Sequence, residues 1–261
     1  MTQAMTMTGR QFAIIGGSGF ADFGTDADGR TLVTRYGVPS APLRRLNYDQ
    51  RHVWALARHG EAHDIPPHRI NYRANLAALA MMGVDSVIAL NTVGVIRRQL
   101  YPGQLAVPDQ LIDYTWGRDH SIYDGSSATL DHIDFTRPFS DPLRALLLAA
   151  AGRIDVDCHD GGVYGVTQGP RLETAAEVDR FDRDGVDFLG MTAMPEAALA
   201  REFGMHYACL SLIVNFAAGR GEKAIHEDID ASTLTAKMQS MRVLKAFFTT
   251  QTGRSDGPRR T

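Results

Sequence analysis

The chain has 261 residues, of which 44% are hydrophobic, 22% are charged and 25 are glycine, enough for one large α/β domain with a substantial core. A net charge of −3 argues against a nucleic-acid partner, because such proteins usually carry a basic face. With two distant cysteines and no apolar run of about 18 residues, we expect a cytoplasmic protein without a disulfide framework, zinc site or membrane span.

Strands and helices alternate along the predicted chain. Apolar runs that end at glycine or polar residues predict buried strands at 12–16, 53–60, 84–94, 186–191 and 206–215. Apolar residues at helical spacing predict helices at 71–84, 141–154, 173–185, 195–204 and 231–249. We therefore expect an α/β domain over 11–250, preceded by a disordered N-terminus at 1–10 and followed by a flexible tail at 251–261.

A glycine-rich turn follows the first predicted strand in the segment IIGGSGF, which contains Ser18. Glycines let backbone amides approach an anion closely, and the serine hydroxyl adds one more donor. The turn lacks the third glycine of a dinucleotide fingerprint and the lysine of a P-loop. A tight turn without a ligand is an equally good interpretation of this segment alone.

Arg58 and His59 follow the second predicted strand. The arginine offers an oxyanion a fixed fork of donors. His59 and His63 have the i, i+4 spacing of metal ligands, but Gly60 stands where a zincin has glutamate, and two prolines soon prevent a helix. We therefore favour a phosphate loop over a metal site here.

Asn91 and Thr92 end the next strand, where they either contact a ligand or cap the loop.

Collinear segments along nearly the whole chain resemble the trimeric purine nucleoside phosphorylases, and more closely their methylthioadenosine phosphorylase branch. These segments are IIGGSG, ARHG, NYRAN, VIALNTVG, PGQLAVPDQLID, HIDF, TQGPRLET, GMTAMPE and SLIVN. The resemblance implies the nucleoside phosphorylase fold, a single α/β domain with a central mixed β-sheet surrounded by helices. It also implies that phosphate attacks the anomeric carbon of a purine nucleoside and releases the base and a pentose 1-phosphate, without a cofactor.

The same resemblance implies roles for particular residues. It assigns Asn215 and His59 to catalysis, and it assigns phosphate binding to Ser18, Arg58, His59, Asn91, Thr92 and Thr192. The base would be bound by Leu172, Glu173, Asn215 and Ala217, and the ribose by Met191 and Thr92. His132, offered by a neighbouring subunit of a homotrimer, and Ile229 would contact the 5′ group. Leu172 departs from the family, which usually has phenylalanine there.

Two positions indicate a 6-oxopurine base. The amide of Asn215 carries both a donor and an acceptor, which suit O6 and a protonated N7, whereas the methylthioadenosine branch has aspartates matching Asn215 and Ala217. Glu173 matches the glutamate with which 6-oxopurine enzymes accept N1–H. Either residue alone could instead cap a strand end or begin a helix.

The 5′ side indicates a methylthio group. Phosphorylases of ordinary nucleosides bind the 5′-hydroxyl through a histidine before the last helix, and Ile229 stands at the matching offset here. We therefore predict 5′-methylthioinosine as the substrate, with inosine and guanosine next, followed by methylthioadenosine. A nucleoside-binding module without catalysis and a metallohydrolase built on HGEAH are the alternatives from other classes.

Overall fold

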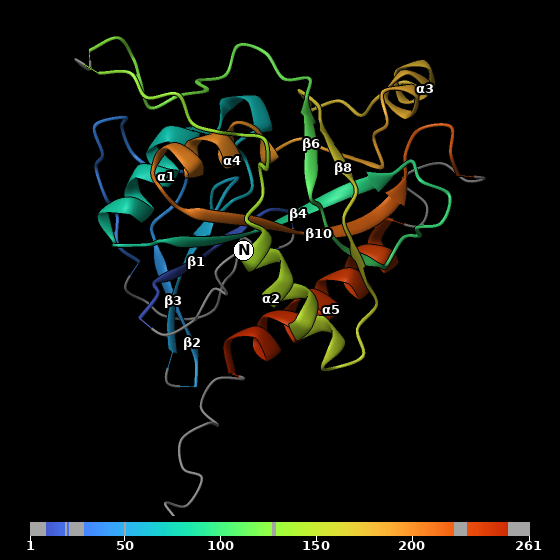
Figure 1. The fold of residues 1–261 in the computed structure, drawn as a ribbon, viewed down its shortest axis with the longest axis horizontal. Helices are drawn as coiled ribbons and strands as arrows, with labels where there is room; N and C mark the ends of the chain where they lie inside the picture. The colour runs from blue at the N-terminus through green and yellow to red at the C-terminus, as the bar shows by residue number, and fades with distance from the viewer. Residues whose placement is uncertain are drawn as a thin grey trace, which may run out of the picture.

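The computed structural model describes residues 9–18, 20, 29–49, 51–126, 129–221 and 229–249 (Figure 1). The predicted disordered start and flexible tail lie outside these residues, apart from Gly9 and Arg10. Arg10 contacts the body of the protein, because its Nη1 lies 3.3 Å from a carboxylate oxygen of Asp85.

Within the described residues, ten strands form one mixed sheet in the order β2-β3-β1-β4-β10-β5-β7, and β9, β8 and β6 extend from β4. The parallel pairs β3–β1, β1–β4 and β4–β10 bring the carboxyl ends of these strands to the same edge. The bounds are β1 Phe12–Gly16, β2 Arg44–Tyr48, β3 Arg51–Ala57, β4 Ser86–Val95, β5 Leu105–Val107, β6 Gln110–Asp113, β7 Cys158–Asp160, β8 Val163–Val166, β9 Phe188–Gly190 and β10 His206–Phe216.

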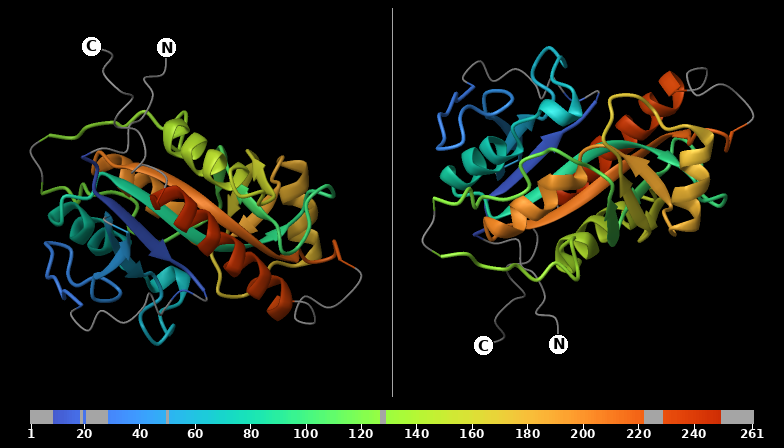
Figure 2. Two further views of the ribbon diagram at one scale, coloured as in Figure 1. Left: turned by 90° about the horizontal axis from the view of Figure 1, so that it is seen from below. Right: turned by 90° about the horizontal axis from the view of Figure 1, so that it is seen from above.

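Helices cover both faces of the sheet (Figure 2). One face carries α1 and α4, and the opposite face carries α2 and α5, so the predicted sheet surrounded by helices is confirmed. The helices are α1 Tyr72–Met81, α2 Asp141–Gly152, α3 Ala175–Arg183, α4 Ala193–Glu202 and α5 Ile229–Thr249, with a short 3-10 helix at Pro67–Arg69.

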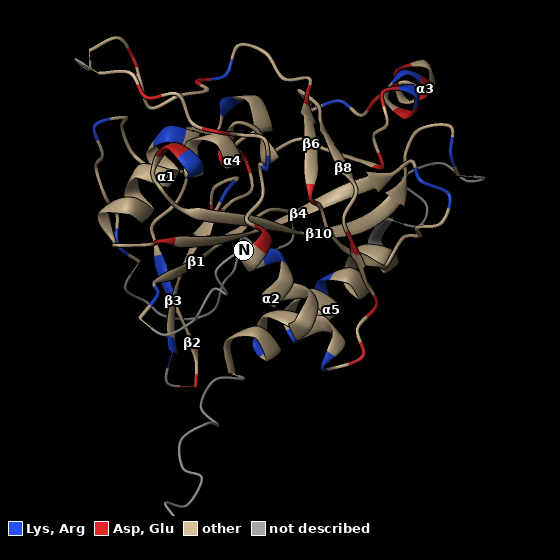
Figure 3. Ribbon diagram, in the orientation of Figure 1, with Lys and Arg blue, Asp and Glu red and all other residues tan. Residues whose placement is uncertain are grey.

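The central strands divide their side chains between two cores. Along β4, Val87 and Ala89 pack with α1 and α4, whereas Ile88 and Leu90 pack with α2 and α5. Successive side chains of a strand point to opposite faces, and both faces are covered here. This is why the strand is an almost continuous apolar run. Neither β4 nor β10 contains a Lys, Arg, Asp or Glu, and charged residues gather on α3 and the loops (Figure 3).

Strand β10 carries a β-bulge near its carboxyl end. Ile213 pairs with Val93 and Asn215 pairs with Gly94, so Val214 is the extra residue. A bulge changes the direction of the side chains that follow it, and bulges are common beside functional sites. The bulge therefore determines where Asn215 points.

Several elements differ from the sequence prediction. Strands β2, β5, β6, β7 and β8 were not predicted as strands. Each has only three to five residues. The residues of β2 alternate between half-buried and exposed, which is the weak pattern of an edge strand. Helix α5 begins at Ile229, two residues before the predicted start. In the described part of the chain, no helix is both long and apolar enough to span a membrane.

Candidate active site

A cavity of about 260 Å³ opens where β1, β3, β4, β9 and β10 end. Carboxyl ends of parallel strands are the usual ligand sites of α/β sheets. The structure brings together in this cavity every residue predicted for phosphate, base or ribose: Ser18, Arg58, His59, Asn91, Thr92, Leu172, Glu173, Met191, Thr192, Asn215 and Ala217. Residues far apart in the sequence therefore share one site.

Arg58 lies at the bottom of this cavity and is fully buried. Its fork faces Glu196, with Nε 2.7 Å from Oε2 and Nη2 2.8 Å from Oε1, and its Nη1 donates to the carbonyl of Leu90 at 2.9 Å. Burial alone would lower the pKa of Arg58, but the Glu196 carboxylate outweighs it and holds that pKa above its usual value. The fork expected to meet phosphate thus faces Glu196. The second Nη2–H points to the carbonyl of Ile15 at 3.5 Å, which leaves the second Nη1–H without a hydrogen-bond partner among the described residues, and the contact of Arg58 with phosphate stays a prediction.

The glycine before Ser18 permits this arrangement. A Cβ on Gly17 would lie 2.9 Å from Nη1 of Arg58 and 2.8 Å from the carbonyl oxygen of Leu90. Only a residue without a side chain lets the turn approach the buried arginine so closely.

A chain of buried hydrogen bonds extends from the Arg58 pair along β10. Tyr207 donates its hydroxyl to Glu196 at 2.8 Å. Further along, the Asn91 amide donates to the sulfur of Cys209 at 3.2 Å and accepts from Ser211 at 2.7 Å. Both ends of the Asn91 amide are thus engaged inside the protein, and its contact with phosphate stays a prediction.

His59 is a buried histidine that lines the cavity beside Arg58. Its Nδ1 lies 2.8 Å from the carbonyl of Ile65, which can only accept, so Nδ1 carries the proton and Nε2 is left with a lone pair. Burial first, and then the charge of Arg58, lower the pKa of His59 from 6.5 to about 4. The imidazole is therefore neutral at pH 7.

His63 lies beside these residues, although it does not line the cavity. Its ring lies 4.8 Å from that of His59, and its Nε2 lies 3.4 Å from Oγ of Ser18. The HGEAH segment was interpreted as part of a phosphate loop rather than a metal site, but no role was predicted for His63 itself. Among the described residues, no group of three or more His, Cys, Asp or Glu could hold a metal ion.

Thr192 and Met191 form the wall that follows β9. Thr192 is buried at the cap position before α4, and its side chain makes no capping hydrogen bond there. Arg118, which sequence reasoning missed, holds this wall by donating to the carbonyls of Met191 at 2.8 Å and Met194 at 2.6 Å. It also donates to the carbonyl of Gln168 at 2.9 Å, so one arginine connects the loops after β8 and β9. An arginine in a loop carries no sequence signal for such a role.

The cavity is also lined by a carboxylate and an amide, those of Glu173 and Asn215. Thr167 donates its hydroxyl to Oε1 of Glu173 at 2.6 Å. Nδ2 of Asn215 donates to the carbonyl of Phe216 at 2.7 Å, which leaves its second N–H and Oδ1 for a ligand. A Cβ on Gly94 would lie 2.9 Å from that Nδ2, so the glycine opposite the bulge makes room for the amide.

Two predicted residues lie apart from these. His132 is exposed and does not line the cavity, and its predicted role is in a neighbouring subunit. Ile229 is the first residue of α5, but its side chain lies outside what the structure describes. Both roles stay predictions.

Known proteins agree with this fold and with the resemblance seen in the sequence. A probable S-methyl-5′-thioinosine phosphorylase of Xylella fastidiosa is 53% identical over 215 residues, covering 81% of this chain and 86% of that protein. The 6-oxopurine nucleoside phosphorylase of Pyrococcus furiosus is 40% identical over 226 residues and 84% of each chain. A solved structure, methylthioadenosine phosphorylase from Schistosoma mansoni in complex with tubercidin, has a TM-score of 0.83 at 28% identity, covering 91% of this chain and 90% of that one.

The model of the phosphorylase superfamily matches residues 11–249, which is nearly all of the described structure. The match extends from the first strand to the last helix and includes each strand end that lines the cavity. The nucleoside phosphorylase fold is therefore confirmed, and the chain belongs to the phosphorylase superfamily.

Proposed function

We propose that this protein uses inorganic phosphate to cleave 5′-methylthioinosine to hypoxanthine and 5-methylthioribose 1-phosphate. The observation that carries the proposal is the shared cavity, in which Ser18, His59 and Thr192 lie with Glu173 and Asn215. The first three are the phosphate side, and the last two are a carboxylate and an amide suited to a 6-oxopurine. The names of the relatives at 53% and 40% identity support the same substrate class.

The phosphate side supplies position and electrostatic stabilisation. A phosphate oxygen attacks C1′ as the C1′–N9 bond breaks. The sugar carries oxocarbenium-like charge in the transition state. Hydroxyl groups of Ser18 and Thr192 and the remaining Nη1–H of Arg58 are donors for the phosphate oxygens. Neutral His59 presents Nε2, which accepts a hydrogen bond from a protonated phosphate oxygen. Preorganised donors of this kind stabilise charge without reorganisation during the reaction.

The base side receives the electrons of the broken bond. The leaving purine becomes negative across its rings and takes up a proton at N7 from solvent, while the hydrogen phosphate gives up its proton as it becomes the sugar phosphate. Oδ1 of Asn215 accepts from that N7–H, and its free N–H donates to O6. Oε2 of Glu173 accepts from N1–H, because Oε1 already receives the hydroxyl of Thr167. Adenine has no proton at N1 and an amino group at position 6, so it does not match this pattern.

The 5′ group and the oligomer belong to the same proposal. Leu172 at the rim is 39% exposed, and Trp116 and Leu130 on the long segment before His132 are 70% and 59% exposed. A homotrimer would cover such apolar side chains and bring His132 of a neighbour to the 5′ end of the substrate. Closed symmetric assemblies are the usual form of soluble homo-oligomers.

The decisive experiment is an assay of the purified protein on 5′-methylthioinosine, inosine and methylthioadenosine, each with and without phosphate. We expect phosphate-dependent release of hypoxanthine, with the highest kcat/KM for methylthioinosine. A higher kcat/KM for inosine would assign the protein to ordinary 6-oxopurine nucleosides. Faster release of adenine from methylthioadenosine would overturn the assignment of the base.

A further inference from the structure

Thr167 follows the last residue of β8 and lies directly behind the base side of the cavity. It is 7% exposed, and its hydroxyl oxygen lies 2.6 Å from Oε1 of Glu173 and 3.4 Å from the carbonyl oxygen of Gly190. Thr167 is not among the residues that line the cavity. It therefore acts on a bound base only through Glu173.

The single hydroxyl proton of Thr167 has two possible acceptors, and the distances favour one of them. Hydroxyl donors lie 2.5–2.7 Å from a charged carboxylate oxygen, and a separation of 3.4 Å is long for an O–H···O bond. The hydroxyl of Thr167 thus donates its hydrogen bond to Glu173. A protonated Glu173 could still accept this bond at its carbonyl oxygen, but a hydroxyl bonds more strongly to a charged carboxylate than to a neutral carbonyl. The bond from Thr167 is therefore strongest when Glu173 is a carboxylate acceptor.

The backbone holds Thr167 in place beside Glu173. Its N–H donates to the carbonyl of Gly190 at 2.8 Å, continuing the parallel pairing of β8 and β9. Nη2 of the buried Arg118 lies 3.3 Å from the carbonyl of Thr167 and 2.9 Å from that of Gln168. The hydroxyl is therefore presented to Glu173 from a fixed position.

We propose that Thr167 is a positioning residue that determines the choice of base, by holding Glu173 as a hydrogen-bond acceptor for N1–H of a 6-oxopurine. This inference rests on the proposed function and deepens it. An adenine N1 has a lone pair, so Glu173 would need to carry a proton and donate. The bond from Thr167 is weaker in that state, so Thr167 influences the choice of base without touching the substrate.

The test compares Thr167→Val, which removes the hydroxyl at nearly constant volume, with Thr167→Ser, which keeps it. The measured quantity is the ratio of kcat/KM for methylthioinosine to kcat/KM for methylthioadenosine. Loss of a charge-assisted hydrogen bond of this kind should lower that ratio by about tenfold or more. We expect this decrease in the valine variant and a ratio within about twofold of wild type in the serine variant. Equal losses on both nucleosides would mean that Thr167 only supports the fold, and would overturn the inference.

A double-mutant cycle separates positioning from general damage. In a Glu173→Gln background, Thr167→Val should leave the ratio within about twofold, because the carboxylate on which it acts is gone. A further tenfold loss in that background would contradict the inference. If Thr167→Val does not fold, Thr167→Ala removes the same hydroxyl without adding a methyl group.

Binding of the free bases distinguishes failure of this inference from failure of the proposed function. Calorimetry with hypoxanthine and adenine does not depend on the 5′ group or on turnover. If wild type cleaves neither methylthio nucleoside, the proposed substrate is wrong, but a loss of hypoxanthine preference in Thr167→Val would still support the inference. An unchanged preference between the bases would overturn it whatever the true nucleoside is.

Discussion

At the scale of single residues, the site depends on glycines that allow polar side chains to approach closely. Gly17 admits the guanidinium of Arg58 beneath the first turn, and Gly94 admits the amide of Asn215 beside β4. The β-bulge at Val214 brings Asn215 opposite that glycine. The position of the amide is therefore set by two neighbouring strands and by the absence of one side chain.

Gly94→Ala should reduce activity while leaving stability almost unchanged. The added methyl would lie 2.9 Å from Nδ2 of Asn215, and the end of a side chain moves more easily than backbone. We expect the displaced amide to lower kcat/KM on 6-oxopurine nucleosides by about 10²-fold, with a small change in Tm. Gly152→Ala is the matched control, because a Cβ there meets no atom within 4 Å. Wild-type activity in Gly94→Ala would mean that Asn215 does not contact the base.

His59 should make the protein less stable as the pH falls from about 6.5 to about 4. Burial and Arg58 lower the pKa of the folded imidazole to about 4, whereas the unfolded chain takes up a proton near 6.5. The unfolded state binds more protons in this window, so stability rises with pH there, by up to about 1.4 kcal/mol per pH unit for one group. Urea unfolding of wild type and His59→Asn across this window measures the difference. Parallel curves for the two proteins would refute the assignment.

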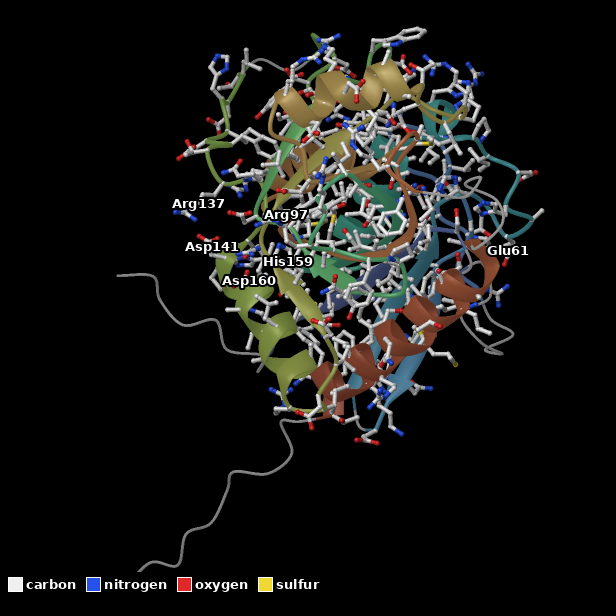
Figure 4. All side chains as sticks on the ribbon, turned by 90° about the vertical axis from the view of Figure 1, so that its right-hand side faces the viewer. Glu61, Arg97, Arg137, Asp141, His159 and Asp160 are labelled. Carbon is white, nitrogen blue, oxygen red and sulfur yellow. The ribbon has the colours of Figure 1, made fainter. Side chains whose placement is uncertain are left out.

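At the scale of elements, a buried ion pair fastens α4 to the end of β3. Arg58 and Glu196 are both fully buried, and Tyr207 of β10 adds a hydrogen bond to the same carboxylate. Surface pairs differ in kind. Arg137 and Asp141, 3.1 Å apart at the start of α2, lie on the outside of the molecule (Figure 4), where such pairs contribute about 0–1 kcal/mol.

Glu196→Gln should destabilise the protein and make it depend more strongly on phosphate. Removing one partner of a buried ion pair costs about 3–5 kcal/mol, because the other charge is left uncompensated. Phosphate in the cavity would compensate Arg58 and, by binding only the folded state, raise Tm. We expect phosphate to raise the Tm of Glu196→Gln by more than that of wild type.

The control for that prediction is Arg137→Gln, which breaks an exposed pair. It should leave both Tm and the phosphate effect near wild type. Equal phosphate-induced shifts in Glu196→Gln and wild type would show that Arg58 does not sense the bound anion. Sodium chloride at the same ionic strength separates specific binding from screening.

At the scale of the whole molecule, the cavity gathers the residues predicted for phosphate and base but not His132. We expect light scattering to give the mass of a trimer, and activity to fall when dilution dissociates it. His132→Ala should raise KM for methylthioinosine without changing the Tm of the protein, since His132 is exposed in the protomer. Full activity of a monomer at nanomolar concentration would contradict the proposed assembly.

Much of the fold could be predicted from the sequence. Strands β1, β4 and β10 and the helices α1, α2 and α4 are long or strongly apolar, and local periodicity is enough to recognise them. Strands such as β5 and β7, with three residues each, have no period to detect and exist because a neighbouring strand pairs with them. The first group reflects local preference, and the second reflects tertiary pairing.

The sequence by itself determined the family and indicated many of the residues that line the cavity, because residue types recur at defined places along the chain. It did not determine how those side chains are used. Only the tertiary structure decided that the fork of Arg58 faces Glu196 and that Thr167 holds Glu173. The physical reason is that hydrogen-bond partners in a core are chosen by proximity and burial. Arg58 and Glu196 lie 138 residues apart in the chain, beyond the reach of any local pattern.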